Sequence, residues 1–197
     1  MIKTAITGNI ASGKSQVEKI LLSKGYKVAD TDKINDFILI TDLSAIKEIK
    51  AAFNDEDILD ENKNISKEKL GKIVFSTGLK KIKLEEILHK RINAKVEQFF
   101  EENKREKVCF VSVPLLFEAN LENKYDKIIF VSADEDIRLK RLMERNHFTE
   151  QYAKTRIRSQ WKEIEKIKKS DFVIYNNSDF NNLRKQTDKI LESLLNL

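Results

Sequence analysis

A short glycine-containing segment near the start of the chain has the residue types and spacing needed to bind phosphate. It fits the pattern G-x-x-x-x-G-K-[ST] with Gly8, Asn9, Ile10, Ala11, Ser12, Gly13, Lys14 and Ser15. The glycines allow successive backbone N–H groups to turn inward around a phosphate, and a following helix N-terminus adds partial positive charge. Lys14 can reach the β- and γ-phosphates of a nucleoside triphosphate, and the Ser15 hydroxyl can ligate Mg²⁺. We therefore predict a nucleoside triphosphate site, which includes the next residue, Gln16.

The elements on either side of this segment support that prediction. A strand pattern ends where the motif begins, and a helix pattern starts at Lys14. Apolar, β-branched stretches predict buried strands at residues 2–7, 27–29, 108–113, 127–132 and 172–175, with helical patterns between them. Strands separated by helix-length segments favour crossover connections and a parallel sheet covered on both faces. We predict an α/β fold of three layers, in which helices flank a five-stranded parallel sheet.

Two segments interrupt this alternation of strands and helices. Helical patterns at 43–53, 66–75 and 79–102 predict a helical insert over about 36–103. A charged segment, 146–169, predicts either a mobile lid or a solvated helix pair. The prediction is therefore one domain, 1–197, with a core of about 1–35, 104–145 and 170–197, an insert of about 36–103 and a lid of about 146–169.

Composition excludes several other classes of protein. The formal charge is +5, but 32 acidic residues are interspersed with 37 basic ones, which argues against nucleic-acid binding and suits a pocket for anionic substrates. No apolar run approaches the roughly 20 residues that cross a bilayer, and the N-terminus lacks the pattern of a signal peptide, so we expect a cytoplasmic protein. The single cysteine, Cys109, provides neither a disulfide framework nor a zinc site of several cysteines.

The phosphate-binding motif alone leaves kinases, GTPases and motor ATPases open. The tetrapeptide at 123–126, Asn-Lys-Tyr-Asp, matches the guanine-reading N-K-x-D, but it precedes a predicted strand instead of following one. No glycine has an aspartate three positions before it, so a D-x-x-G switch is absent from the sequence. We interpret the tetrapeptide as a surface loop that matches by chance.

Further motifs across nearly the whole chain resemble those of dephospho-CoA kinases. They are the D-x-D of Asp30 and Asp32, the V-P-L-L-F-E that ends at Glu118, the R-I-x-x-Q that ends at Gln160, and a strand ending in Asn176. We expect the V-P-L-L-F-E motif to follow the central strand. The resemblance implies ATP-dependent phosphorylation of the ribose 3′-hydroxyl of dephospho-CoA, the last step of coenzyme A biosynthesis, with Mg²⁺ and without an obligate protein partner.

The resemblance also implies residues that bind the acceptor. Asp32 becomes the candidate catalytic base, because the second aspartate of the family's D-x-D faces the acceptor hydroxyl. From the residues alone, Asp30 or Asp32 could instead cap a helix beginning near Lys33. The other implied acceptor-binding residues are Lys67, His89, Leu115 and Glu118. Lys67 replaces a usual arginine, and Lys90 replaces the proline that usually follows His89. His89 could equally be a helix-surface or partly buried histidine, and Glu118 a glutamate in the first turn of a helix.

Basic residues late in the chain complete the site that the resemblance implies. Arg141 and Arg145 are placed to meet the adenine or the phosphates, with Arg141 in a catalytic role, and Asn176 lies where the adenine is expected. Arg138 departs from the family, which usually has glutamine there, and Ser178 replaces a common glycine. Two rival functions stay open. One is another small-molecule or nucleoside monophosphate kinase on the same scaffold, and the other is a basic P-loop protein that binds RNA.

Overall fold

The computed structural model describes residues 1–74 and 78–197. Phe75, the last residue of the helix predicted over 66–75, lies outside the described residues. The chain forms two compact units. One unit comprises Met1–Asp30 and Phe100–Leu197, and the other comprises Thr31–Phe99.

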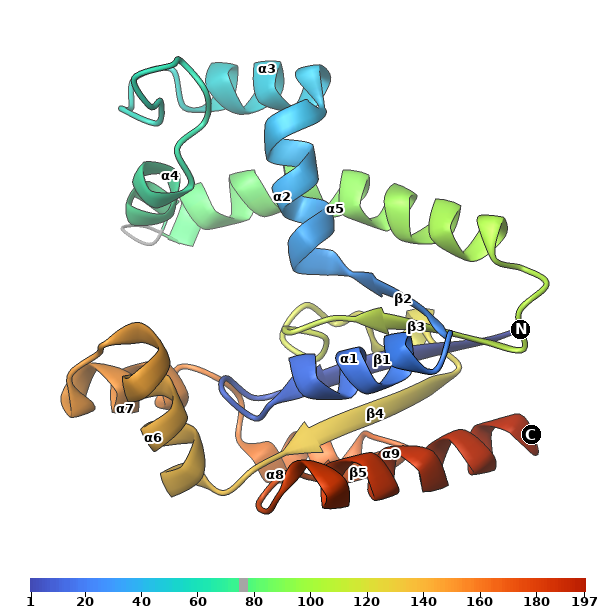
Figure 1. Ribbon diagram of the computed structural model, residues 1–197. Helices are drawn as coiled ribbons and strands as arrows, with labels where there is room; N and C mark the ends of the chain where they lie inside the picture. Colours follow the sequence, from blue (N-terminus) through green and yellow to red (C-terminus); the bar gives the residue numbers. More distant parts are fainter. Residues whose placement is uncertain (75–77) are drawn as a thin grey trace. The chain divides into compact units, whose positions relative to one another are not determined.

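The first unit is built on a five-stranded parallel sheet in the order β2-β3-β1-β4-β5, which confirms the predicted α/β fold (Figure 1). The strands are β1 (Ile2–Gly8), β2 (Lys27–Asp30), β3 (Val108–Ser112), β4 (Lys127–Ser132) and β5 (Phe172–Tyr175). The expectation that the strand beginning at Val108 is central was wrong. The middle strand is β1, which pairs Ala5 with Val111 of β3 on one side and with Ile128 of β4 on the other.

Side chains alternate between the two faces of this sheet, as the pleat of a strand requires. Ile6, Phe110 and Ile129 lie on one face, in a buried cluster with residues of helices α1 (Lys14–Ser23) and α9 (Phe180–Leu195). The neighbours Val111 and Ile128 point to the opposite face and are also buried. Burial of both faces explains why the strands read as continuous apolar runs in the sequence.

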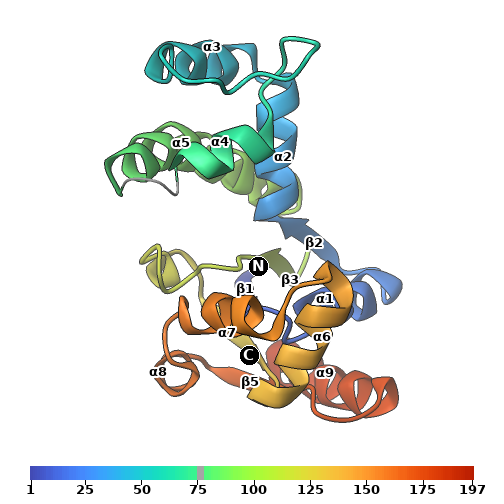
Figure 2. The ribbon, with the colours of Figure 1, turned by 90° about the vertical axis from the view of Figure 1, so that its left-hand side faces the viewer.

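Three helices lie between β4 and β5: α6 (Glu135–Asn146), α7 (Glu150–Arg158) and α8 (Glu163–Lys168). Helices α6 and α7 lie side by side (Figures 1 and 2) and share a small core of Leu142, Ala153 and Ile157. Thr149 caps α7 by accepting a hydrogen bond from the backbone N–H of Tyr152. The tetrapeptide at 123–126 begins in the short 3₁₀ helix η1 (Glu122–Lys124) and ends before β4, so it does not follow a strand.

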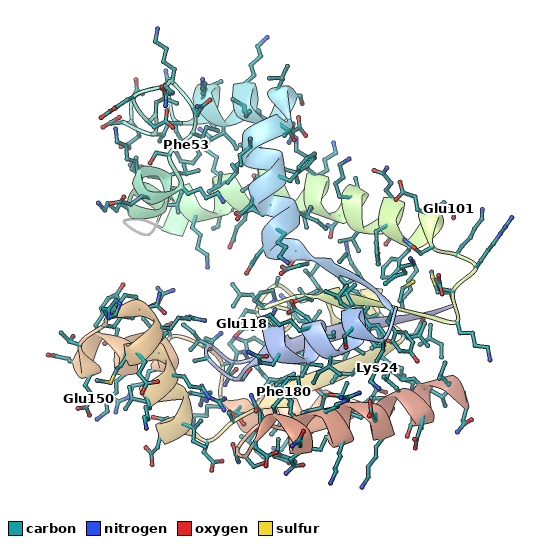
Figure 3. The ribbon with its side chains drawn as sticks, in the orientation of Figure 1. Lys24, Phe53, Glu101, Glu118, Glu150 and Phe180 are labelled. Carbon is teal, nitrogen blue, oxygen red and sulfur yellow. The ribbon has the colours of Figure 1, made fainter. Side chains whose placement is uncertain are left out.

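The second unit is helical, with α2 (Thr31–Thr41), α3 (Leu43–Ala52), α4 (Lys67–Val74) and most of α5 (Gly78–Glu102). Its apolar core includes Ile38, Ile49, Leu88 and Phe53, which Figure 3 labels. Helix α5 has 25 residues, but charged side chains run along it. Among the described residues, no helix combines the length and the apolar surface needed to cross a membrane.

Candidate active site

The predicted phosphate-binding loop connects the end of β1 to the start of α1, as the motif requires. Gly13 has a φ of 93°, in the left-handed region that residues with side chains avoid. Gly8 is required for a different reason, because a Cβ there would lie 2.5 Å from the carbonyl oxygen of Val131. The loop is tightened by a hydrogen bond of 3.0 Å from the N–H of Ser12 to the carbonyl of Asn9. Both glycines of the motif are therefore dictated by local structure.

Lys14, the motif lysine, lies in a polar cluster at the carboxyl end of the sheet. Its ammonium donates a hydrogen bond of 2.8 Å to Glu18 and another to the hydroxyl of Ser112. Ser112, the last residue of β3, in turn donates to the same Glu18 oxygen at 2.6 Å. Glu18 is buried, so its carboxylate depends on these two donors. The phosphate-binding motif does not indicate Glu18, although its spacing of four residues from Lys14 on one helix was a usable signal.

Asn176 and Arg141 converge on the carbonyl oxygen of Ser12 within the loop. The Asn176 side chain donates to this oxygen at 2.8 Å, and Nη1 of Arg141 donates to it at 3.4 Å. Nη2 of Arg141 also donates to the Asn176 carbonyl at 3.0 Å. Asn176 follows β5 and Arg141 lies on α6, so two elements distant in sequence hold the loop. The predicted contacts of Asn176 with the adenine and of Arg141 with phosphate stay predictions.

Gln160 contacts the loop at a different residue, Ile10. Its side-chain oxygen accepts a hydrogen bond of 2.7 Å from the backbone N–H of Ile10. The loop side chains of Ile10 and Ala11 also pack against the core shared by α6 and α7. The sequence motif R-I-x-x-Q pointed to Gln160 without assigning it a role, and the structure connects it directly to the phosphate-binding loop.

Glu118, labelled in Figure 3, lies in a turn that follows β3 and not in the first turn of a helix, which corrects that alternative. Its carboxylate lies 2.5 Å from the ammonium of Lys166, a side chain that is 0% exposed. The backbone N–H of Trp161 donates to the same carboxylate oxygen at 3.4 Å. A second ion pair joins the ammonium of Lys169 to the carboxylate of Glu122 at 2.9 Å. Two glutamates after β3 thus anchor the segment that contains α8.

Arg138 and Arg145, both on α6, have different environments. Arg138 is buried, and its Nε donates to the carbonyl of Ala133 at 2.9 Å. Its Nη2 lies 3.4 Å from the carboxylate of Glu163, which also accepts a hydrogen bond from the hydroxyl of Ser132. The departure from the family's glutamine therefore gives Arg138 an ionic partner on α8. Arg145 is exposed and donates to Asn146, the next residue, at 2.8 Å.

Three other predicted acceptor residues lie in the helical unit: Asp32, Lys67 and His89. Leu115 is instead exposed in the turn after β3. Helix α2 begins at Thr31, so Asp32 lies inside its first turn, and Asp30, not Asp32, precedes the helix. A carboxylate in a first turn interacts favourably with the helix dipole. Lys67, the first residue of α4, forms an ion pair with Asp36 of α2. His89 is exposed on α5.

A parallel sheet whose middle strand leads into this loop, with a lysine and a serine at the start of the next helix, defines the class of P-loop proteins that bind nucleoside triphosphates. The family model described as "Dephospho-CoA kinase" matches residues 2–182. The chain therefore belongs to the dephospho-CoA kinase family, as the sequence motifs had indicated.

Individual relatives agree with this assignment. The chain is 41% identical to a dephospho-CoA kinase of Fusobacterium nucleatum over 192 residues, which cover 96% of each sequence. It is 40% identical to a dephospho-CoA kinase of Listeria innocua, with 97% of this chain and 96% of the relative covered. Among solved structures, dephospho-CoA kinase from Campylobacter jejuni matches with a TM-score of 0.72 and 34% identity, covering 98% and 97% of the two chains. The Thermus thermophilus protein TT1252 matches with a TM-score of 0.84, 29% identity and the same coverage.

Proposed function

We propose that this protein transfers the γ-phosphoryl group of ATP to the 3′-hydroxyl of the ribose of dephospho-CoA and releases ADP and coenzyme A. The observation that carries the proposal is an intact phosphate-binding loop, with Lys14 at the start of α1, in a chain that matches the family over residues 2–182. We place the reaction in the cytoplasm. ATP and dephospho-CoA are the substrates, and no obligate protein partner is part of the proposal.

On the ATP side, the residues of the loop and of α1 supply positive charge and hydrogen-bond donors. Residues 8–16 bind the phosphates, through those backbone N–H groups of the loop that do not already donate to protein oxygens, and Lys14 neutralises charge on the β- and γ-phosphates. Arg141 holds the Ser12 carbonyl, so its guanidinium lies at the loop, where it stabilises charge that develops during transfer. Asn176 and Arg145 contribute to binding of the nucleotide.

The chemistry of the donors fits a magnesium ion that arrives with ATP. Ser15 presents an exposed hydroxyl in the first turn of α1, and Mg²⁺ bound to nucleotides commonly takes only one or two protein oxygens beside phosphates and water. Among residues 1–74 and 78–197, no group of three or more His, Cys, Asp or Glu side chains is arranged to hold a metal by itself. Ser15 would hold the ion, which would neutralise negative charge on the phosphates during transfer.

On the acceptor side, Asp32 accepts the proton of the ribose hydroxyl as that oxygen attacks the γ-phosphoryl group, and it orients the nucleophile. Lys67, His89, Leu115 and Glu118 bind the acceptor. We assign this binding mainly to the helical insert of about 36–103, and closure over ATP to a lid of about 146–169 within a single domain. Closure would exclude water, which otherwise competes with the acceptor hydroxyl.

A coupled assay of ADP release tests the proposed reaction. Dephospho-CoA should be phosphorylated in strong preference to AMP, CMP, shikimate and gluconate. Preference for any of these other acceptors would replace dephospho-CoA with a different substrate on the same scaffold. RNA binding that weakens steeply with salt, without phosphorylation of any acceptor, would favour the nucleic-acid alternative.

Two pairs of variants test the residue roles within this reaction. Asp32→Asn should fold normally and lose most of kcat, whereas Asp55→Asn, at an exposed position of the same unit, should be fully active. Lys14→Ala should abolish turnover, whereas Lys19→Ala, exposed on the same helix, should not. Near-normal turnover of Asp32→Asn would remove Asp32 as the base, and activity of Lys14→Ala would contradict the ATP site.

A further inference from the structure

The contact between Gln160 and the loop fixes how the Gln160 amide is oriented. The partner on the loop is the N–H of Ile10, which can only donate, so the atom that faces it at 2.7 Å is the amide oxygen. The NH₂ group of the same amide must then point away from that bond. This NH₂ group has two N–H donors and belongs to a side chain that contacts the phosphate-binding loop.

Packing on both sides holds Gln160 in this position. Before it, α7 and the loop share an apolar core through Ile157 and the side chain of Ile10. The backbone N–H of Gln160 donates to the carbonyl of Ile157 at 3.4 Å, which closes the last turn. After it, the N–H of Trp161 donates to Glu118. Gln160 is therefore fixed by the fold and is not a free surface amide.

The Ile10 N–H belongs to the set of loop N–H groups that the motif provides for phosphate oxygens. The Gln160 oxygen accepts the hydrogen bond of this N–H, and the NH₂ group of the same amide offers two other donors. We expect these donors to lie on the side of the amide away from Ile10, beyond the backbone of the loop. A phosphate oxygen is the kind of group that such donors bind.

We infer that Gln160 is a phosphate-binding residue of the ATP site, which accepts a hydrogen bond from the loop with its oxygen and donates to a phosphate oxygen of ATP with its NH₂ group. The inference rests on the proposed function for its ligand, because it assumes that the loop holds ATP. A purely structural role, in which Gln160 only ties α7 to the loop, makes a different prediction for one substitution.

That substitution is Gln160→Glu. An ionised carboxylate still accepts the hydrogen bond from Ile10, so the tie between α7 and the loop is kept, but both donors are lost and a negative charge faces the phosphates. Gln160→Ala loses the acceptor and the donors together. Gln151→Glu adds the same charge to an exposed position of α7 and controls for net charge, and repeating the titration at raised salt screens repulsion between the new Gln160→Glu charge and the phosphates.

The decisive measurement is calorimetric titration of each variant with Mg²⁺ and adenylyl imidodiphosphate, a non-hydrolysable ATP analogue, together with urea unfolding. We expect Gln160→Glu to unfold like the unmodified protein and to bind the analogue about 10- to 100-fold more weakly, the range for loss of a hydrogen bond to a charged group. Gln160→Ala should also bind more weakly, and Gln151→Glu should bind normally.

Two results would overturn the inference. Unchanged binding by Gln160→Glu would leave Gln160 only a structural tie, and tighter binding by Gln160→Ala would mean that its oxygen competes with phosphate for the Ile10 N–H. No acceptor is present in this titration, so an error in the proposed acceptor does not affect it. Failure of the unmodified protein to bind the analogue would instead contradict the proposed ATP site.

Discussion

The substitution Gly13→Ala should destabilise the protein because the added Cβ atom both strains the backbone and collides with a neighbouring side chain. Gly13 has a φ of 93°, and a Cβ built on it would lie 2.0 Å from the side-chain nitrogen of Asn176. That nitrogen donates to the Ser12 carbonyl at 2.8 Å and is buried. An added methyl group therefore strains the backbone and also displaces Asn176 from the loop.

Each effect has a typical energetic size. A residue with a side chain in the left-handed region costs about 1–3 kcal/mol, and loss of one hydrogen bond costs about 0.5–1.5 kcal/mol. We expect Gly13→Ala to lower the free energy of unfolding by about 2–4 kcal/mol. Gly71→Ala is the matched control, because Gly71 lies within α4 and a Cβ added to it would meet no atom within 4 Å. This control should be more stable by about 0.5–1 kcal/mol.

Urea unfolding followed by circular dichroism measures both variants. Adding Asn176→Ala tests the mechanism, because the collision disappears and the same hydrogen bond cannot be lost twice. The double variant should therefore lose about 1 kcal/mol less than the sum of the two single variants. Unchanged stability of Gly13→Ala, or strict additivity in the double variant, would refute the reasoning.

Three further predictions concern residues outside the loop. Burial raises the pKa of Glu122, but its own backbone hydrogen bond and the Lys169 ammonium outweigh burial and hold that pKa below the ordinary 4.5. The pair of Glu122 and Lys169 should therefore stabilise the protein at pH values above the ordinary pKa and lose this contribution as pH falls through the lowered pKa. Urea unfolding should show that the difference in free energy of unfolding between the unmodified protein and Glu122→Gln vanishes in acid. Burial raises the pKa of the Cys109 thiol, so iodoacetamide should label Cys109 only after unfolding, and rapid labelling of the native protein in mass spectra would contradict its burial. Arg138→Gln should lower the free energy of unfolding by about 1–3 kcal/mol, because Glu163 loses its ionic partner, and unchanged stability in urea would deny the pair a structural role.

The strands and their parallel arrangement were predictable because burial on both faces leaves an apolar signal in every strand. The predicted strands at 127–132 and 172–175 match β4 and β5 at both ends. The order of the strands was less accessible, since nothing local marks which strand is in the middle. The start of α2 was also misjudged: the helix begins at Thr31, two residues before Lys33. A first turn with Asp32 in it reads in sequence much like a cap followed by a helix.

The position of the loop was predictable, but the contacts that support it were not. The motif specifies Gly13 and Lys14 by their own chemistry. The contacts of Asn176 with Ser12 and of Gln160 with Ile10 join positions 164 and 150 residues apart, and no local pattern encodes such a separation. Family motifs indicated that these positions matter, and the structure shows what they touch.

Trp161 gives the protein a built-in optical reporter beside its nucleotide loop. It is the one tryptophan in the 197-residue sequence, and it directly follows Gln160. Trp161 is 42% exposed, and the Lys169 ammonium lies 5.7 Å from its ring centre, so its emission depends on both water and a nearby charge. Rearrangement of the segment around Gln160 would alter both influences. We therefore expect stopped-flow fluorescence of the unlabelled protein to follow nucleotide binding in real time.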